Sequence, residues 1–338
     1  MALGTLADAP RFAPEAGLSI TKRIETKTDI SLDDMTVSVN GQEMDASMMS
    51  MEMDTSMQQV VTVTDTYVSV SDGRPTKLER SFDELSSKTN VSMSHAMMGD
   101  QDSDMDGSSE LEGETVLFSW DDDEGEYSVA FAGDSDGDDE LLEGLAEDLD
   151  MRALLPDGDV SEDDSWPVEP YALRSVFAPG GSVKIEPDDT EGGPMGMGGA
   201  PTPSLNEMLG ELEGEVTATY PGTRDEDGVT VAVIEIEADV SAANDLTDYM
   251  EGMMDGMDTG GMEIEMEIDS FDVEFMFEGQ GELLWNVESG VLYSLTMSGE
   301  TSQIVDSAMN MAMGGMEQAM EQSMTMTGSQ TTTITTEE

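Results

Sequence analysis

The sequence predicts a mainly β protein, built as a large antiparallel curved sheet or half-open β-barrel with a few short covering helices and Met/Asp-rich disordered loops. Three observations favour this class. Apolar and polar residues alternate over long segments, glycine-containing turns separate these segments, and methionine-rich acidic stretches interrupt them. Such alternation is typical of antiparallel sheets with one apolar face and one solvated face.

The first strand patterns lie in an expected N-terminal β-rich half, residues 8–186. Leu18 and Ile20 lead into Ile24, Thr26, Thr28, Ile30 and Leu32, all on one parity, which predicts one long half-buried strand. Residues 60–70 resume the pattern, and Asp72-Gly73 predicts a turn before a strand over 76–85.

Further along this half, residues 90–113 are polar, acidic and methionine-rich, which predicts a long loop. Alternation on both sides of an acidic turn predicts a hairpin over 116–131. Leucines at three-to-four spacing predict a short amphipathic helix over 138–151.

A Gly/Pro/Met-rich linker or loop is expected over residues 187–203, followed by a second β-rich half over 204–338 that could pack with the first as one domain. The apolar parity changes near Ser270, which predicts a β-bulge there. Other expected elements are strands over 215–220, 229–240, 262–277, 283–286, 291–297 and 331–335, and helices over 245–257 and 307–322.

Charge restricts the classes of partner. The 338 residues include 76 Asp and Glu but 12 Lys and Arg, for a formal net charge of −64. A field this negative repels nucleic acid, whereas it attracts cations and basic protein surfaces. Mutual repulsion of the carboxylates favours a saline or calcium-containing environment, unless the acidity is simply a solubility surface.

The N-terminal residues and the length of the apolar runs bear on the cellular compartment of the protein. Residues 1–7 end with small residues at the third-last and last places, Thr5 and Ala7, and resemble the remnant of a signal peptide with cleavage after Ala7. We therefore expect an exported protein, periplasmic or extracellular. The chain contains no cysteine and no run of 18 apolar residues, so neither disulfides nor a transmembrane segment is expected.

Two segments carry a family resemblance. Leu154-Leu155-Pro156, Val160 and then Asp164-Ser165-Trp166 resemble the "LP...V..GDSW" segment of uncharacterised exported bacterial proteins of planctomycete type. In this segment Asp163 replaces the glycine that usually precedes Asp-Ser-Trp. Residues 281–290 are similar to the C-terminal hairpin of the same proteins. The resemblance implies a half-barrel like that of periplasmic lipoprotein carriers, without an assigned activity. Trp166 is expected to pack over an open sheet edge.

An acidic run offers a candidate calcium site. Asp102, Asp104 and Asp106 precede Gly107 at the alternate spacing with which a calcium loop begins. The twelfth position is Gly113 instead of the usual glutamate, so Glu112 is the nearest candidate for the last ligand. The alternative is a solvated acidic loop, and calcium is therefore a possible cofactor.

Methionine is the second unusual feature, with 31 residues in the chain. Thioethers and an imidazole suit Cu(I), which makes Met93, His95, Met97 and Met98 a candidate copper site. Methionine is also a flexible apolar residue that fills gaps in cores.

No catalytic site is expected. Residues 133–137 match G-x-S-x-G only as letters, because a strand-to-helix context is missing and the single histidine lies upstream. We therefore predict a non-enzymatic exported protein that binds an apolar ligand or an envelope partner on a curved sheet. The alternative is metal handling through the acidic loops or the Met/His clusters.

Overall fold

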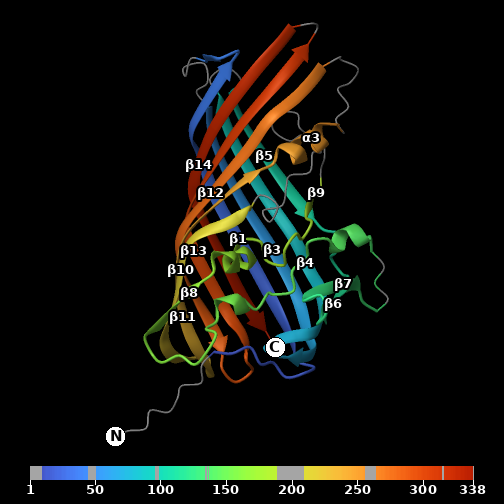
Figure 1. The fold of residues 1–338 in the computed structure, drawn as a ribbon, viewed down its shortest axis with the longest axis vertical. Coiled ribbons are helices and arrows are strands. Elements are labelled where there is room, and N and C mark those ends of the chain that lie inside the picture. Colours follow the sequence, from blue (N-terminus) through green and yellow to red (C-terminus); the bar gives the residue numbers. More distant parts are fainter. Residues whose placement is uncertain are drawn as a thin grey trace.

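The computed structural model describes residues 10–44, 51–95, 99–133, 135, 137–188, 209–255, 264–313 and 316–337. Over these residues the chain forms one open antiparallel sheet of 14 strands with a few short helices, which confirms the predicted fold class (Figure 1). None of the helices in these ranges has the length and apolar character needed to cross a membrane.

The strands follow one another as long hairpins. Their bounds are β1 (Ser19–Val39), β2 (Gln42–Glu43), β3 (Met51–Ser71), β4 (Arg74–His95), β5 (Gly99–Ser108), β6 (Thr115–Asp121), β7 (Glu126–Phe131), β8 (Asp164–Val168), β9 (Glu186–Pro187), β10 (Glu211–Glu226), β11 (Val229–Asp245), β12 (Ile264–Asn286), β13 (Val291–Met313) and β14 (Met316–Glu337). The order across the sheet is β7-β6-β4-β3-β1-β14-β13-β12-β11-β10-β8, and β5 also pairs with β4.

Alternation of side chains explains why these segments become strands with two different faces. On β11, Ile234, Ile236 and Val240 are buried, whereas Glu235 and Glu237 between them are exposed. Successive residues of a strand point to opposite faces, so each apolar residue in this pattern is buried while each acid stays in water.

The first and last strands meet in the middle of the sheet. β1 pairs with β14 from Thr21 opposite Glu337 to Val39 opposite Met320, with one bulge between Leu32 and Asp34. The strands of the two chain halves therefore belong to one sheet. The expected signal remnant at 1–7 and the linker at 189–203 lie outside the described residues, whereas 187–188 are described.

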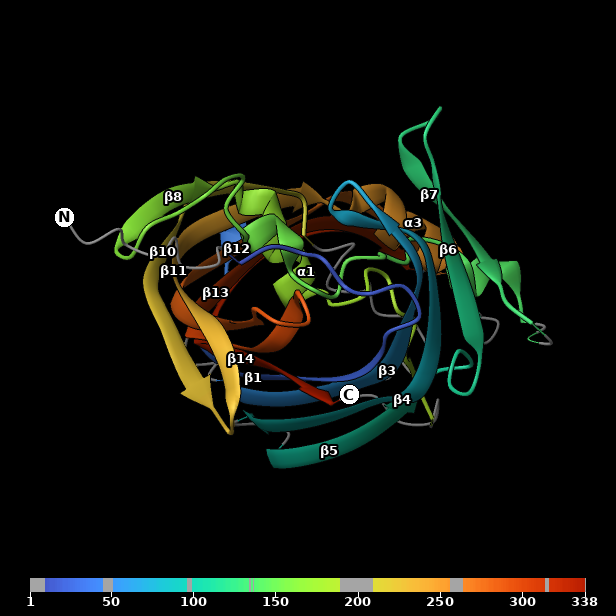
Figure 2. The same ribbon diagram turned by 90° about the horizontal axis from the view of Figure 1, so that it is seen from below.

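The chain between β7 and β9 lies partly inside the curve of the sheet, whereas its strand β8 belongs to the sheet itself. We call residues 139–185 the covering segment; it contains the 3-10 helices η1 (Asp139–Leu142), η2 (Arg152–Leu154) and η3 (Pro170–Leu173), and the helix α1 (Arg174–Phe177). Figure 2 shows α1 within the curve between β8 and β4. The ring of Phe177 contacts the rings of Phe275 and Phe277 edge to face, at centroid distances of 5.4 and 5.0 Å. The face of the sheet that this segment contacts is the concave face.

Several predicted elements are confirmed. β1 spans the long strand expected from Leu18 to Leu32, β6 and β7 form the expected hairpin, and the register shifts between Ile268 and Ser270 as expected for a bulge. Helix α3 (Thr247–Asp255) lies within the expected range 245–257. Trp166 lies on the edge strand β8, where its Nε1 donates to the Leu154 carbonyl at 3.3 Å.

Three predicted elements are wrong. Residues 90–113 are not one long loop, because β4 continues to His95 and β5 then pairs with it. Residues 307–322 are not a helix but the facing ends of β13 and β14, paired as far as Met313 and Met316. The helix expected over 138–151 is reduced to η1. In the first two segments, polar side chains are compatible with strands because one face of the sheet is solvated.

Candidate functional site

Two contacts identify which side chains point to the concave face. Thr332 Oγ1 on β14 donates to the carbonyl of Val176 at 3.3 Å, and the Tyr67 hydroxyl on β3 donates to Asp150 at 2.8 Å. Both acceptors belong to the covering segment. Since alternate side chains of a strand share a face, Tyr67 and Thr332 fix the concave face along β3 and β14, and register pairing extends it to the neighbouring strands.

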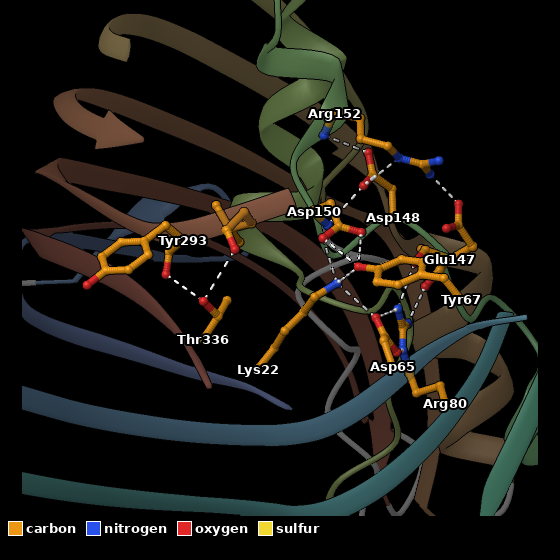
Figure 3. A network of polar contacts seen from close by, with 12 residues as sticks. Lys22, Asp65, Tyr67, Arg80, Glu147, Asp148, Asp150, Arg152, Tyr293 and Thr336 are labelled. Carbon is orange, nitrogen blue, oxygen red and sulfur yellow. Dashed lines mark hydrogen bonds and ion pairs between the residues drawn. The ribbon is translucent and has the colours of Figure 1, made fainter. Parts of the chain in front are cut away.

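A buried network of charged side chains lies on the concave face, toward the end of the sheet that is drawn at the bottom of Figure 1 (Figure 3). Asp65 on β3 accepts from Arg80 Nε and Nη2 at 2.7 and 2.9 Å, and from Lys22 Nζ at 2.9 Å. Lys22 and Arg80 come from the two neighbouring strands, β1 and β4. All three residues have 0% exposure, so three strands are joined by charges that have no contact with water.

The covering segment completes this network. Asp150 lies 2.8 Å from Lys22 Nζ and also accepts from the Tyr67 hydroxyl. Arg80 donates to the carbonyls of Ala146 and Glu147 at 2.8 and 2.7 Å. The segment is thus held against the sheet by charge-assisted hydrogen bonds, which are stronger than those between neutral groups.

Burial and neighbouring charges move the pKa values of this network in different directions. Burial alone would raise the pKa of Asp65, but Arg80 and Lys22 outweigh it and lower the pKa to about 2. Burial raises the pKa of Glu147 to about 7, although Arg152 opposes the shift. Glu147 Oε1 has no hydrogen-bond partner within the described part of the chain. Asp65 is therefore held ionised, whereas Glu147, whose Oε2 pairs with Arg152, loses its proton near neutral pH.

The upper half of the concave face, in the orientation of Figure 1, differs in composition from the lower half. We call its methionines the methionine face: Met35, Met51, Met53, Met57, Met93, Met105, Met309, Met311, Met320, Met324 and Met326. Strand register places each of them on the concave side. Met57 is 45% exposed although it lies on this side, and most of the others are partly exposed. The face is thus a surface of methionines interspersed with uncharged polar residues, and the described residues cover it only in part.

The opposite, convex face carries acids. Asp54, Glu274 and Glu321 lie there and are exposed. Met276 is the exception among the strand methionines with described side chains, because it lies on the convex face and is 39% exposed. The sheet therefore separates carboxylates from thioethers over its upper half.

The aspartates predicted to bind calcium lie on the strand β5. Asp102, Asp104 and Asp106 are exposed at alternate positions, and Ser92 Oγ donates to Asp102 at 2.9 Å. Alternate residues of a strand are about 7 Å apart, so these carboxylates do not surround a common point as they would in a calcium loop. Glu112 lies apart from them and accepts from the backbone N–H of Leu85 at 3.0 Å. The described residues contain no cluster of three or more acidic or histidine side chains placed to hold a metal ion.

Two of the four predicted copper residues, Met93 and His95, lie on β4. Met93 is buried on the methionine face, and the backbone of His95 pairs in register with Met51. Met97, Met98 and the side chain of His95 lie outside the described part. The structure instead brings Met51 and Met53, from β3, next to Met93.

Sequence reasoning missed the buried network, although a signal was present. Lys22 falls between Ile20 and Ile24 on the buried parity of β1, and Arg80 falls between Leu78 and Phe82 in the same way. A charged residue at an apolar parity position requires a partner of opposite charge, because an unpaired buried charge is strongly unfavourable.

Comparisons with known proteins do not identify a family for this chain. No family model and no curated protein matches the chain. One solved structure with some similarity is the outer membrane protein OprG from Pseudomonas aeruginosa, with 6% identity over 96% of this chain and 98% of that chain, and a TM-score of 0.20. A similarity this weak does not indicate a shared fold or function.

The central position of Asp65 leads to a stability prediction. We expect Asp65→Asn to lower the free energy of unfolding by about 3–5 kcal/mol, because Lys22 and Arg80 lose their shared counter-charge while remaining buried. The matched control is Glu84→Gln, which breaks the exposed Arg23–Glu84 pair and should cost less than about 1 kcal/mol. Urea denaturation measures both losses. Similar losses in the two variants would show that Asp65 has no special structural role.

Glu147 leads to a pH prediction. Its pKa is about 7 in the folded chain against 4.5 for the ordinary carboxyl, so the folded state binds more protons between these values. The free energy of unfolding should therefore fall as pH rises from 4.5 to 7, by on the order of 3 kcal/mol from this group. Glu147→Gln should remove this dependence. Denaturation at fixed ionic strength from pH 4.5 to 8 tests it, and a difference between variant and parent that stays constant with pH contradicts it.

Proposed function

We propose that this chain is a non-enzymatic exported protein that binds the acyl chains of lipids on its methionine face. The observation that carries the proposal is the gathering of partly exposed thioethers on one side of a curved sheet whose other side is acidic. Monomeric proteins rarely expose extended apolar surfaces without a binding role.

The chemistry of methionine favours a flexible ligand. Its unbranched side chain has three rotatable bonds and a polarisable sulfur, so a methionine surface adapts to ligands of irregular shape. The segment of β1 from Thr28 to Val39 extends over roughly 40 Å, which is long enough to support an extended acyl chain. Each buried methylene group contributes about 0.8 kcal/mol.

The charge of the protein supports a choice of head group. With a formal net charge of −64, the chain repels anionic amphiphiles and attracts cationic ones. Neutral, zwitterionic or cationic lipids are therefore the preferred ligands, and salt should reduce the discrimination between cationic and anionic forms.

The polarity of the methionine face supports a binding role over catalysis. No Asp or Glu occupies the concave parity between Thr28 and Val39 of β1, or between Met51 and Gln59 of β3. General acid-base chemistry requires an ionisable group within hydrogen-bond reach of the substrate, and these positions do not supply one.

Two methionines of similar exposure provide the test. Met57 is 45% exposed on the concave face, and Met276 is 39% exposed on the convex face. We expect Met57→Glu to weaken binding of a fluorescent, uncharged acyl-chain probe at least tenfold, about 1.4 kcal/mol, because a carboxylate enters the apolar surface. Met276→Glu should leave the affinity unchanged.

Thermal midpoints of the two variants control for folding, since both substitutions place a carboxylate at a similarly exposed position. Equal affinities of the two variants would place the probe away from the methionine face. Absence of saturable binding to the parent chain, in low or in molar salt, would exclude the proposed function altogether.

A further inference from the structure

Three thioethers lie next to one another where β3 and β4 pair in the upper half of the sheet. Met53 is directly opposite Met93, and Met51 precedes Met53 by two residues on the same face. Directly opposite residues have Cβ atoms about 4.5–5.5 Å apart, and alternate residues of one strand lie about 7 Å apart. The methionine side chain is long enough for all three sulfur atoms to reach a point above the strands.

The environment of these three residues is suited to a ligand that methionine recognises. Met93 is 5% exposed, whereas Met51 and Met53 are partly exposed, so the cluster has a buried base and an accessible side. Glu52 and Asp54 alternate with Met51 and Met53 and are exposed on the other face. Carboxylates are thus absent from the immediate strand positions of the cluster.

Thioethers without carboxylates select one class of metal ion. Sulfur of methionine is a soft, neutral ligand that favours Cu(I) and chemically similar Ag(I), whereas calcium and magnesium require oxygen ligands. A monovalent ion bound by neutral ligands keeps its positive charge, and the strongly negative field of the chain raises the local concentration of such an ion.

We propose that Met51, Met53 and Met93 form a binding site for a soft monovalent metal ion, Cu(I) or Ag(I). This site goes beyond acyl-chain binding, and it draws two of its three ligands from β3, at residues 51 and 53. Similar groups of three methionines occur at Met309, Met311 and Met320, and at Met35, Met324 and Met326. The test therefore compares the metal binding of variants with that of the parent chain.

Leucine substitutions separate the metal site from the apolar surface. Met53→Leu and Met93→Leu each remove one sulfur while conserving side-chain volume and apolar character. The matched control is Met57→Leu, which removes a sulfur from the same face of β3 at a position opposite Thr89 and not opposite a methionine.

The experiment titrates the full chain with Ag(I), and with Cu(I) under anaerobic conditions against a chromophoric Cu(I) chelator, while NMR follows the labelled methionine methyl groups. We expect Met53→Leu and Met93→Leu each to reduce the number of tightly bound ions by one, or to weaken one ion at least tenfold. Met57→Leu should leave the binding isotherm unchanged, and the methyl signals of Met51, Met53 and Met93 should shift together in the parent chain.

Three results would overturn the proposal: no tight binding by the parent chain, binding that survives Met53→Leu and Met93→Leu, or an equal loss in Met57→Leu. Circular dichroism and thermal midpoints establish that each variant is folded. The metal titration contains no acyl probe, so its failure would leave the proposed lipid function standing, and the converse also holds.

Discussion

The pairing of β1 with β14 determines the geometry on which the rest of the structure depends. It joins the strands of the N-terminal half to those of the C-terminal half, so that one concave face extends across both. A shift of this register by one residue would reverse the face of every side chain on a strand. Ile24 opposite Ile334 and Met35 opposite Met324 define the register, since both members of each pair lie on the concave face.

Charge imposes the second constraint. A chain with 76 acidic residues folds only if most of them remain in water, and the sheet achieves this by placing acids on its convex face. The exceptions are informative: Asp65, Glu147 and Asp150 are buried, and each lies next to a basic group. Lys22, Arg80 and Arg152 lie where the covering segment meets the sheet, and that contact is sensitive to the loss of a single partner.

Much of the fold could be predicted from period-two alternation, as in β1 and β11, where apolar residues mark one face. The prediction of strands failed where neither set of alternating residues is typical of a strand. In β5, aspartates alternate with Gly, Gln, Ser and Met, and at the end of β13 methionine alternates with Ala and Asn. Both compositions also fit loops or helices, and cross-strand pairing stabilises the extended form.

The candidate sites show the same limit. The sequence indicates that methionine is abundant and that Met93 belongs to a cluster, but it does not reveal that Met51 and Met53 lie beside it, because strand register joins residues about forty positions apart. Charged residues on buried parity, such as Lys22 and Arg80, could have been recognised as a network in advance. Which acid completes it could not be predicted, since Asp150 lies in a stretch whose leucine spacing predicts a helix that the structure does not form.

The β1–β14 pairing also has a kinetic consequence. Its partners are about 300 residues apart in sequence, from Thr21 with Glu337 to Val39 with Met320. Contacts of such long range form late, and proteins that depend on them fold slowly. During synthesis one edge of β1 has no native partner until the last strand has emerged, and exposed strand edges promote aggregation. A chain of this topology would benefit from a chaperone that covers the exposed edge of β1 and prevents aggregation until the C-terminal strand pairs with it.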